Sequence, residues 1–237
     1  EDQSGSLMFG ASDRIELVST IVLAIATILT AWSAFQAGKW GGTQSINFSE
    51  AGAARTESTR ADTRAGQLIQ IDVAMYIDWV TALSNDIANG DIVLDDASSY
   101  EPTPGTVSGF LALRFRDEFQ PALDAWLGTD PINYEDAPPT PFALVVDNGD
   151  PVYVVALEVE ADRLTAVADQ KAADARTANQ NGDNYVLTMV LFASVLFFAG
   201  VSSKLARKRN RILALGFGVV LLLAGAFILV SLPIHPI

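Results

Sequence analysis

Three stretches of this chain carry almost no charge, and this limits how it can fold more than any other feature. Residues 15–38 contain one charged side chain, Glu16, whereas residues 184–203 contain none. The last stretch, residues 212–237, also lacks charged side chains. A hydrocarbon core of about 30 Å is crossed by roughly 20 mostly apolar helical residues. Each stretch therefore predicts one membrane-spanning helix.

The sequence predicts an all-α membrane protein with three transmembrane helices. A long antiparallel helical stalk and a small helical and loop cap are expected outside the membrane. The first apolar stretch has neither a basic start nor an obvious small-residue cleavage site, so it is interpreted as an anchor and not as a signal peptide. The predicted segments are a cytoplasmic N-terminus (1–14), transmembrane helix 1 (15–40), an extracytoplasmic stalk and cap (41–183, with the cap at about 90–150), transmembrane helix 2 (184–203), a basic cytoplasmic turn (204–211), transmembrane helix 3 (212–232) and an extracytoplasmic tail (233–237).

Basic residues predict the orientation. Five of the fifteen Lys and Arg residues lie in the short connection between the second and third apolar stretches. Short loops rich in Lys and Arg stay in the cytoplasm, so the N-terminus is expected inside and the main domain outside. Topology and contact with lipid head groups explain this cluster better than a specific ligand site does. The five residues are Lys204, Arg207, Lys208, Arg209 and Arg211.

The predicted outside segment, residues 41–183, is strongly acidic. It holds 24 Asp and Glu against 8 Lys and Arg, a net charge of −16. This excess disfavours nucleic acid as a partner, because nucleic-acid binding needs a basic surface. It suits cations or a basic protein, although solubility is the simpler explanation. Cysteine is absent, which excludes disulfides and thiolate chemistry.

The stretch "AFQAGKWGGTQSINFSEAGAART", residues 34–56, raises the question of whether the first helix ends at the membrane surface. Small residues recur through it at alternating steps of four and three without a change of phase, as in a helix packed along its length. No proline occurs before Pro102. One coiled-coil-like helix is therefore predicted from about residue 13 to residue 89. Its small residues, called the seam below, are Thr20, Ala24, Thr27, Ala31, Ala34, Gly38, Gly42, Ser45, Ser49, Gly52, Thr56, Thr59, Thr63 and Gly66.

Glycine within a helix costs roughly 1 kcal/mol relative to alanine, so the seam glycines need compensation. Close approach of a second helix is the usual compensation, and it predicts that the seam is a packing surface. Chance is the alternative, because alanine- and serine-rich sequences produce such stripes readily. Two small faces would also be expected of a helix with neighbours on both sides. The second row of this kind is Ala51, Ala54, Ser58, Ala61, Ala65 and Leu68.

A return helix is predicted from Val152 into the second apolar stretch. Pro151 would occupy its first position, where the missing N–H costs little. The sequence "NGDN" at residues 181–184 invites a break, but the helical phase continues through it.

The cap is expected to contain one or two helices and to pack against Met75, Tyr76 and Trp79. Within it, "RFRDEF" at residues 114–119 reads as part of an amphipathic helix. The charged side chains expected to be solvated there are Arg114, Arg116, Asp117 and Glu118, and the apolar positions are Phe110, Leu111, Phe115, Phe119, Leu123, Trp126 and Leu127.

Four stretches, "TAWSAFQAGKWGG", "ADTRAGQLIQIDV", "RFRDEFQPALDAWL" and "DNYVLTMVLFASVLFFAG", together resemble a group of bacterial three-span membrane proteins of unknown function. The resemblance implies bacterial origin and the three-span order, and no activity or cofactor. Eleven Arg against four Lys also fit a GC-rich bacterial genome. The predicted location is the bacterial cytoplasmic membrane.

No catalytic, cofactor-binding or metal site is predicted. His235 is the only histidine and lies near the end among prolines, which excludes histidine triads and nitrogen- or sulfur-rich zinc sites. No phosphate-binding or dinucleotide-binding motif occurs. The acidic stretches "LDDASSYE" and "NYEDAP" supply oxygen ligands for calcium, but neither matches the twelve-residue calcium loop.

The leading functional hypothesis is a non-enzymatic, self-associating membrane protein whose stalk and cap act as a scaffold or bind partners. The bilayer and further copies of the chain are its expected partners, with an unidentified protein at the cap as an open alternative. The second hypothesis is an oligomeric ion channel or transport accessory, and a carboxylate enzyme in the cap ranks third. The channel would be lined by the hydroxyl face of the first helix, namely Thr20, Thr27, Ser45, Ser49, Thr56, Thr59 and Thr63.

Overall fold

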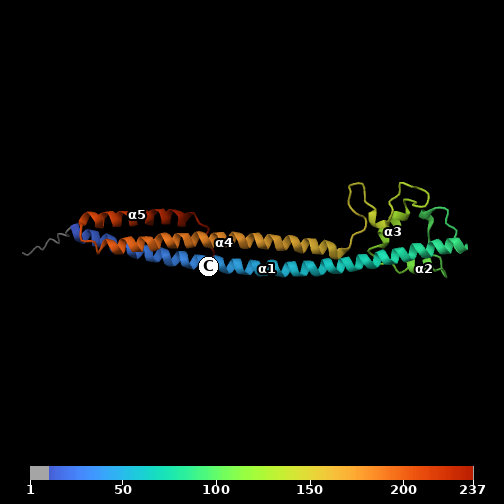
Figure 1. Ribbon diagram of the computed structural model, residues 1–237, viewed down its shortest axis with the longest axis horizontal. Helices are drawn as coiled ribbons and strands as arrows, with labels where there is room; N and C mark the ends of the chain where they lie inside the picture. Colours follow the sequence, from blue (N-terminus) through green and yellow to red (C-terminus); the bar gives the residue numbers. More distant parts are fainter. Residues whose placement is uncertain (1–10, 237) are drawn as a thin grey trace, which may run out of the picture. The chain divides into compact units, whose positions relative to one another are not determined.

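The computed structural model describes residues 11–236, and three long helices account for most of them (Figure 1). These are α1 (Ala11–Asn89), α4 (Ala156–Ser202) and α5 (Lys208–Ser231). All three are long and apolar enough to cross a membrane. The described residues form no β-strand, and their only bridge is an isolated one between Val145 and Pro151. The prediction of an all-helical chain with three such helices is confirmed.

Helix α1 continues through the glycine-rich stretch without interruption, as predicted, and runs for 79 residues. It ends where Gly90 adopts a positive φ of 82°. A glycine in this conformation is a common helix terminator, because it lets following N–H groups turn back to the last carbonyls. Gly90 N–H donates to the Ile87 carbonyl at 3.0 Å, and Asp91 N–H donates to the Asp86 carbonyl at 2.9 Å.

The chain divides into two compact units, and unit 1 comprises Glu1–Ala51 and Asp169–Ile237. Its described core is apolar and includes Val22, Ala26, Val195, Ala199 and Leu215. Side-chain hydrogen bonds also join α1 to α4 in this unit. They include Ser19 Oγ to Ala199 O at 2.8 Å and Thr188 Oγ1 to Ser33 Oγ at 3.0 Å.

Helix α5 packs on α4 in unit 1 through glycines. A Cβ at Gly218 would lie 3.5 Å from Phe198 Cβ, an ordinary contact. At Gly225 it would lie 2.8 Å from the buried Phe192 ring, which leaves no room for it. These two glycines therefore allow close approach of the helices.

Unit 2, Gly52–Ala168, contains the cap. The cap has helices α2 (Val107–Ala112) and α3 (Gln120–Leu127) and two short 3₁₀ helices, η1 (Ala97–Ser99) and η2 (Pro141–Ala143). Its aromatic core packs on α1 at Tyr76, Trp79 and Met75, which confirms the predicted contact. The cap members of this core include Phe115, Phe119, Leu123, Trp126 and Leu127.

Helix α4 begins four residues later than predicted. Val152 N–H donates to the Leu144 carbonyl at 3.0 Å, and Gly149, with φ 88°, turns the chain between them. Pro151 lies in this small hairpin and not at the first position of the helix. Backbone pairing at residues 144–152 therefore delays the helix to Ala156.

The prediction that "RFRDEF" forms part of an amphipathic helix is wrong. Helix α2 ends at Ala112 and α3 begins at Gln120, with Pro121 in its first turn. Proline inside a helix removes a hydrogen bond and clashes with the preceding turn, so the helix restarts here. Phe110, expected in the apolar face, is exposed.

The third apolar helix, α5, begins before residue 212, where transmembrane helix 3 was predicted to start. Because α5 begins at Lys208, only residues 203–207 form the connection. Most of the predicted cytoplasmic N-terminus, residues 1–10, lies outside the described residues.

Candidate functional site

The predicted seam does not pack against the part of the chain that the structure describes. Thirteen of its fourteen residues are exposed, and Gly66 is partly buried. The second row is the one that packs within the chain: Ala51, Ser58, Ala61 and Ala65 are buried. Ser58 Oγ contacts Ala161 O of α4 at 2.9 Å. In unit 2, the face of α1 that packs against α4 therefore lies beside the seam on the helix surface.

The seam glycines have open space where a side chain would begin. A Cβ added at Gly38, Gly42, Gly52 or Gly66 meets no atom within 4 Å. Gly225, by contrast, faces the Phe192 ring. Contacts within the described part of the chain explain Gly218 and Gly225 of α5 and leave the seam glycines without compensation.

The threonine hydroxyls of the seam are already satisfied by the helix itself. Each donates to the carbonyl oxygen four residues earlier, as Thr27 does to Leu23 at 2.8 Å. The seam can therefore meet another surface without leaving these donors unpaired. The other members of this set are Thr20, Thr56, Thr59 and Thr63.

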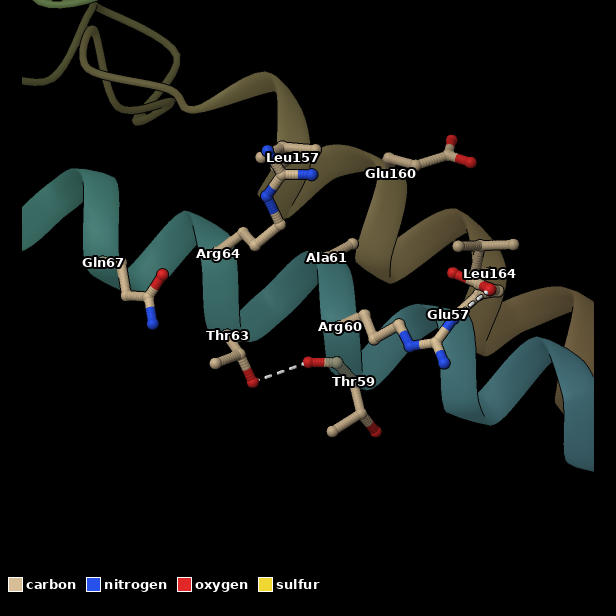
Figure 2. Close-up of a pocket in the computed structure, with 10 residues that line it drawn as sticks. All are labelled: Glu57, Thr59, Arg60, Ala61, Thr63, Arg64, Gln67, Leu157, Glu160 and Leu164. Atoms are coloured by element: carbon tan, nitrogen blue, oxygen red, sulfur yellow. Dashed lines mark hydrogen bonds and ion pairs between the residues drawn. The ribbon is translucent and has the colours of Figure 1, made fainter.

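A groove of about 720 Å³ borders the seam in unit 2 (Figure 2). Thr59 and Thr63 line one side, and Leu157 and Leu164 of α4 line the other. Arg60 in its wall is paired with Glu57 at 2.8 Å. The seam is thus continuous with a concave, partly apolar surface.

The predicted basic residues lie around the start of α5. Lys204, Arg207, Lys208 and Arg209 are exposed, whereas Arg211 is partly buried. Positively charged side chains are electrostatically unfavourable at the N-terminus of a helix, and no side chain caps the N-terminus of α5. Helix stability therefore does not explain their position.

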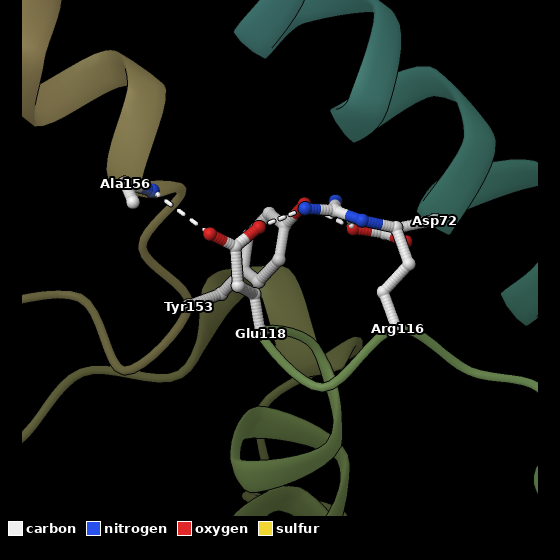
Figure 3. Close-up of polar contacts among 5 residues, drawn as sticks. All are labelled: Asp72, Arg116, Glu118, Tyr153 and Ala156. Carbon is white, nitrogen blue, oxygen red and sulfur yellow. Dashed lines mark hydrogen bonds and ion pairs between the residues drawn. The ribbon is translucent and has the colours of Figure 1, made fainter.

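A buried polar cluster in unit 2 was not predicted from the sequence (Figure 3). Asp72 on α1 is fully buried, and its Oδ2 accepts hydrogen bonds from Arg116 Nη1 and Tyr153 OH, each at 2.6 Å. Arg116 also pairs with Glu118, whose Oε1 accepts the Ala156 N–H at 3.3 Å. This arrangement, the Asp72 cluster, ties the cap and the start of α4 to α1.

The expectation that Arg116 and Glu118 are solvated is wrong, because both are drawn into the Asp72 cluster. Burial, and then the Asp72 carboxylate, raise the pKa of Tyr153 above its usual range, so the phenol stays a donor. Arg116 balances the charge of Asp72 in a site where an unpaired carboxylate would be costly. These bonds join three separate segments of unit 2, which indicates a structural role for the Asp72 cluster.

Asp130 holds a second polar contact in the cap. Its Oδ1 accepts the Ala97 N–H at 3.0 Å, and its Oδ2 accepts from Asn133 Nδ2 at 2.8 Å. The residue has a φ of 47°, a conformation that Asn and Asp tolerate best. The Ala97 bond, followed by the Asn133 bond, lowers the pKa of Asp130.

This lowered pKa predicts an acid-sensitive cap. The stabilisation is present above the ordinary pKa of Asp and is lost as the pH falls through the lower folded value. In Asp130→Asn, we expect the melting temperature to fall less between about pH 5 and pH 3 than in the wild type. Thermal unfolding followed by circular dichroism checks this, and equal losses in both proteins would contradict it.

Residues 233–236 fold onto α1 and α4 in unit 1. The buried Gln36 side chain forms two hydrogen bonds with the His235 backbone. It accepts from the N–H at 2.9 Å and donates to the carbonyl at 3.5 Å. His235 Nε2 lies 2.7 Å from Thr43 Oγ1, and Trp40 and Tyr185 both donate to the Pro233 carbonyl. The only histidine thus serves packing, a role that its position in the sequence did not reveal.

The described residues contain no group of three or more His, Cys, Asp or Glu that could hold a metal ion. No protein-family model matches the chain, and no curated protein or solved structure shows significant similarity to it. The resemblance to bacterial three-span proteins therefore has no matching family model behind it.

Proposed function

We propose that this chain is a non-enzymatic integral membrane protein that associates with further copies of itself through the seam and offers a helical scaffold outside the membrane. The three apolar helices support membrane insertion. The basic residues around the start of α5, which do not favour that helix terminus, support a cytoplasmic position for it.

The bonds between α1 and α4 support the antiparallel stalk. In unit 1, Ser19 pairs with Ala199 and Ser33 with Thr188, so numbers rise along α1 as they fall along α4. The ion pair between Glu50 and Lys171, at 2.6 Å, continues this order.

The open space at the seam glycines is the observation that carries self-association. Four helical glycines at roughly 1 kcal/mol each are a substantial cost that no contact within the chain offsets. A neighbouring helix at close distance would offset it, since small residues let backbones approach. Symmetric association of identical copies is the usual way such a face is covered. The neighbouring groove adds a concave surface for the same contact.

Bulky side chains on the seam test this proposal. Gly52→Leu combined with Thr59→Leu is expected to raise the dissociation constant of the oligomer in mild detergent at least tenfold, because leucine separates closely packed helices. Both positions are exposed in the single chain, so the substitutions should leave its own packing intact. Light scattering after size-exclusion chromatography measures the mass.

Ala53→Leu combined with Thr81→Leu is the matched control, because both residues are exposed on α1 outside the seam. This variant should keep the wild-type mass. A monomeric wild-type protein, or equal dissociation of both variants, would end the proposal.

A further inference from the structure

A second groove of about 310 Å³ lies in the cap side of unit 2, and its lining is almost wholly apolar. Its lining includes the partly exposed Val80 and Ile87 of α1, the buried Trp79 and Trp126, and Ile132. Ile132 is 54% exposed, although it is a large apolar side chain. Such an apolar surface in a solvated domain is a feature of binding sites.

The walls of this groove are fixed and have few polar groups to offer. Trp79 Nε1 donates to Tyr100 OH at 3.1 Å, and Trp126 Nε1 donates to Pro138 O at 2.6 Å, so both indole donors are used elsewhere. Ser84 is the only lining residue with a polar side chain otherwise. The groove therefore offers apolar contact and little that would orient a polar small molecule.

Hydrogen bonds also hold the segments that line the groove together. Ala97 N–H bonds to Asp130, and Asn133 Nδ2 donates to the Asp95 carbonyl at 2.9 Å. These bonds join the segment that contains Leu94 to the segment that contains Ile132. The groove is thus preformed, which lowers the cost of binding.

The segments that line the groove belong to a strongly acidic stretch of the chain. Residues 65–162 contain eighteen Asp and Glu and only two basic residues, Arg114 and Arg116. Arg116 is committed to the Asp72 cluster, and Arg114 lies over the Phe110 ring at 3.4 Å. Asp95 and Asp96 are exposed within the segment that forms one wall. A second copy of this domain would bring the same negative charge, so a basic partner fits better.

We infer that this groove binds an apolar side chain from a basic amphipathic segment of another protein. The apolar anchor contacts Val80, Ile87 and Ile132, while lysine or arginine residues beside it pair with the exposed Asp95 and Asp96. The inference names the chemistry of the partner within the proposed scaffold role and does not depend on self-association.

The test uses the full chain in mild detergent and a fluorescent synthetic amphipathic peptide of lysine and leucine. Two matched peptides, one of glutamate and leucine and one of lysine and serine, separate the two requirements. The first peptide is expected to bind at least tenfold more tightly than either of the others, and its affinity should fall with added salt. Fluorescence anisotropy measures each affinity.

Variants of the protein distinguish binding in the groove from binding of the peptide to detergent. Binding to detergent should be the same in samples of every variant. Ile132→Ser should weaken binding roughly tenfold, as expected for a central contact, and Val80→Ser provides a second test in α1. Leu113→Ser is the control, because Leu113 is 70% exposed in the same unit but does not line the groove. Equal affinity for all three peptides, or equal losses in Leu113→Ser and both groove variants, would overturn the inference. The mass of the oligomer, measured on the same samples, tests self-association separately.

Discussion

Replacing Arg116 with methionine is expected to lower the free energy of unfolding of unit 2 by about 3–5 kcal/mol, the usual cost of leaving one partner of a buried ion pair alone. Asp72 has no exposed surface, and the Arg116 side chain is 23% exposed. Methionine keeps much of the apolar stem and removes the charge. Tyr153 OH would still donate a hydrogen bond to Asp72, but the neutral phenol does not balance the charge of the carboxylate. Urea unfolding of the full chain in mild detergent, followed by tryptophan fluorescence, measures the change.

A second substitution distinguishes lost charge balance from lost packing. Adding Asp72→Asn to Arg116→Met removes the unpaired carboxylate, so the double variant should regain a large part of the stability. Arg163→Met is the matched control, because Arg163 and Glu160 form an exposed pair on α4 and such pairs contribute little. If Arg116→Met is no less stable than Arg163→Met, Asp72 is not held by charge balance.

The course of the long helices was predictable because its signals are local. Gaps between charged residues marked the three apolar stretches, and the unbroken spacing of small residues carried α1 through Gly41 and Gly42 to Asn89. Each signal repeats within a few turns of a helix, so it can be read without knowing what lies beside it.

Which face of α1 packs within the chain was not predictable in this way. The seam and the row containing Ser58 have the same kind of residues at the same spacing. The choice between them depends on α4, whose Ala161 lies 103 positions from Ser58. A periodic pattern identifies candidate faces, and a contact between distant segments selects one.

The Asp72 cluster was missed for a related reason. "RFRDEF" contains three kinds of charged residue in a short stretch, a pattern typical of a solvated surface. The partners that draw Arg116 inward are far away, since Asp72 is 44 residues from Arg116 and 81 from Tyr153. Pro121, in the first turn of α3, is the only local sign that no single helix runs through this segment.

Gly109→Ala is expected to destabilise the cap by about 2–3 kcal/mol or more, through overpacking against the backbone. A Cβ on Gly109 would overlap the Thr103 carbonyl oxygen and lie 2.9 Å from the carbon and nitrogen of the same residue. The backbone has little freedom to withdraw. Gly109 N–H donates to Thr106 Oγ1 at 3.1 Å, and Ser108 N–H donates to the buried Asp86 at 2.9 Å.

The same substitution at Gly66 is the control, because a Cβ there meets no atom within 4 Å. Gly66→Ala should raise the stability of α1 by about 0.5–1 kcal/mol, the gain expected from helix propensity alone. Hydrogen exchange read by mass spectrometry localises each effect: faster exchange over residues 103–112 is expected in Gly109→Ala and unchanged exchange there in Gly66→Ala. If both variants show the same stability and exchange, the contact with Thr103 does not restrain the cap. A loss of stability in Gly66→Ala confined to the oligomer would instead place a second copy of the chain against the seam.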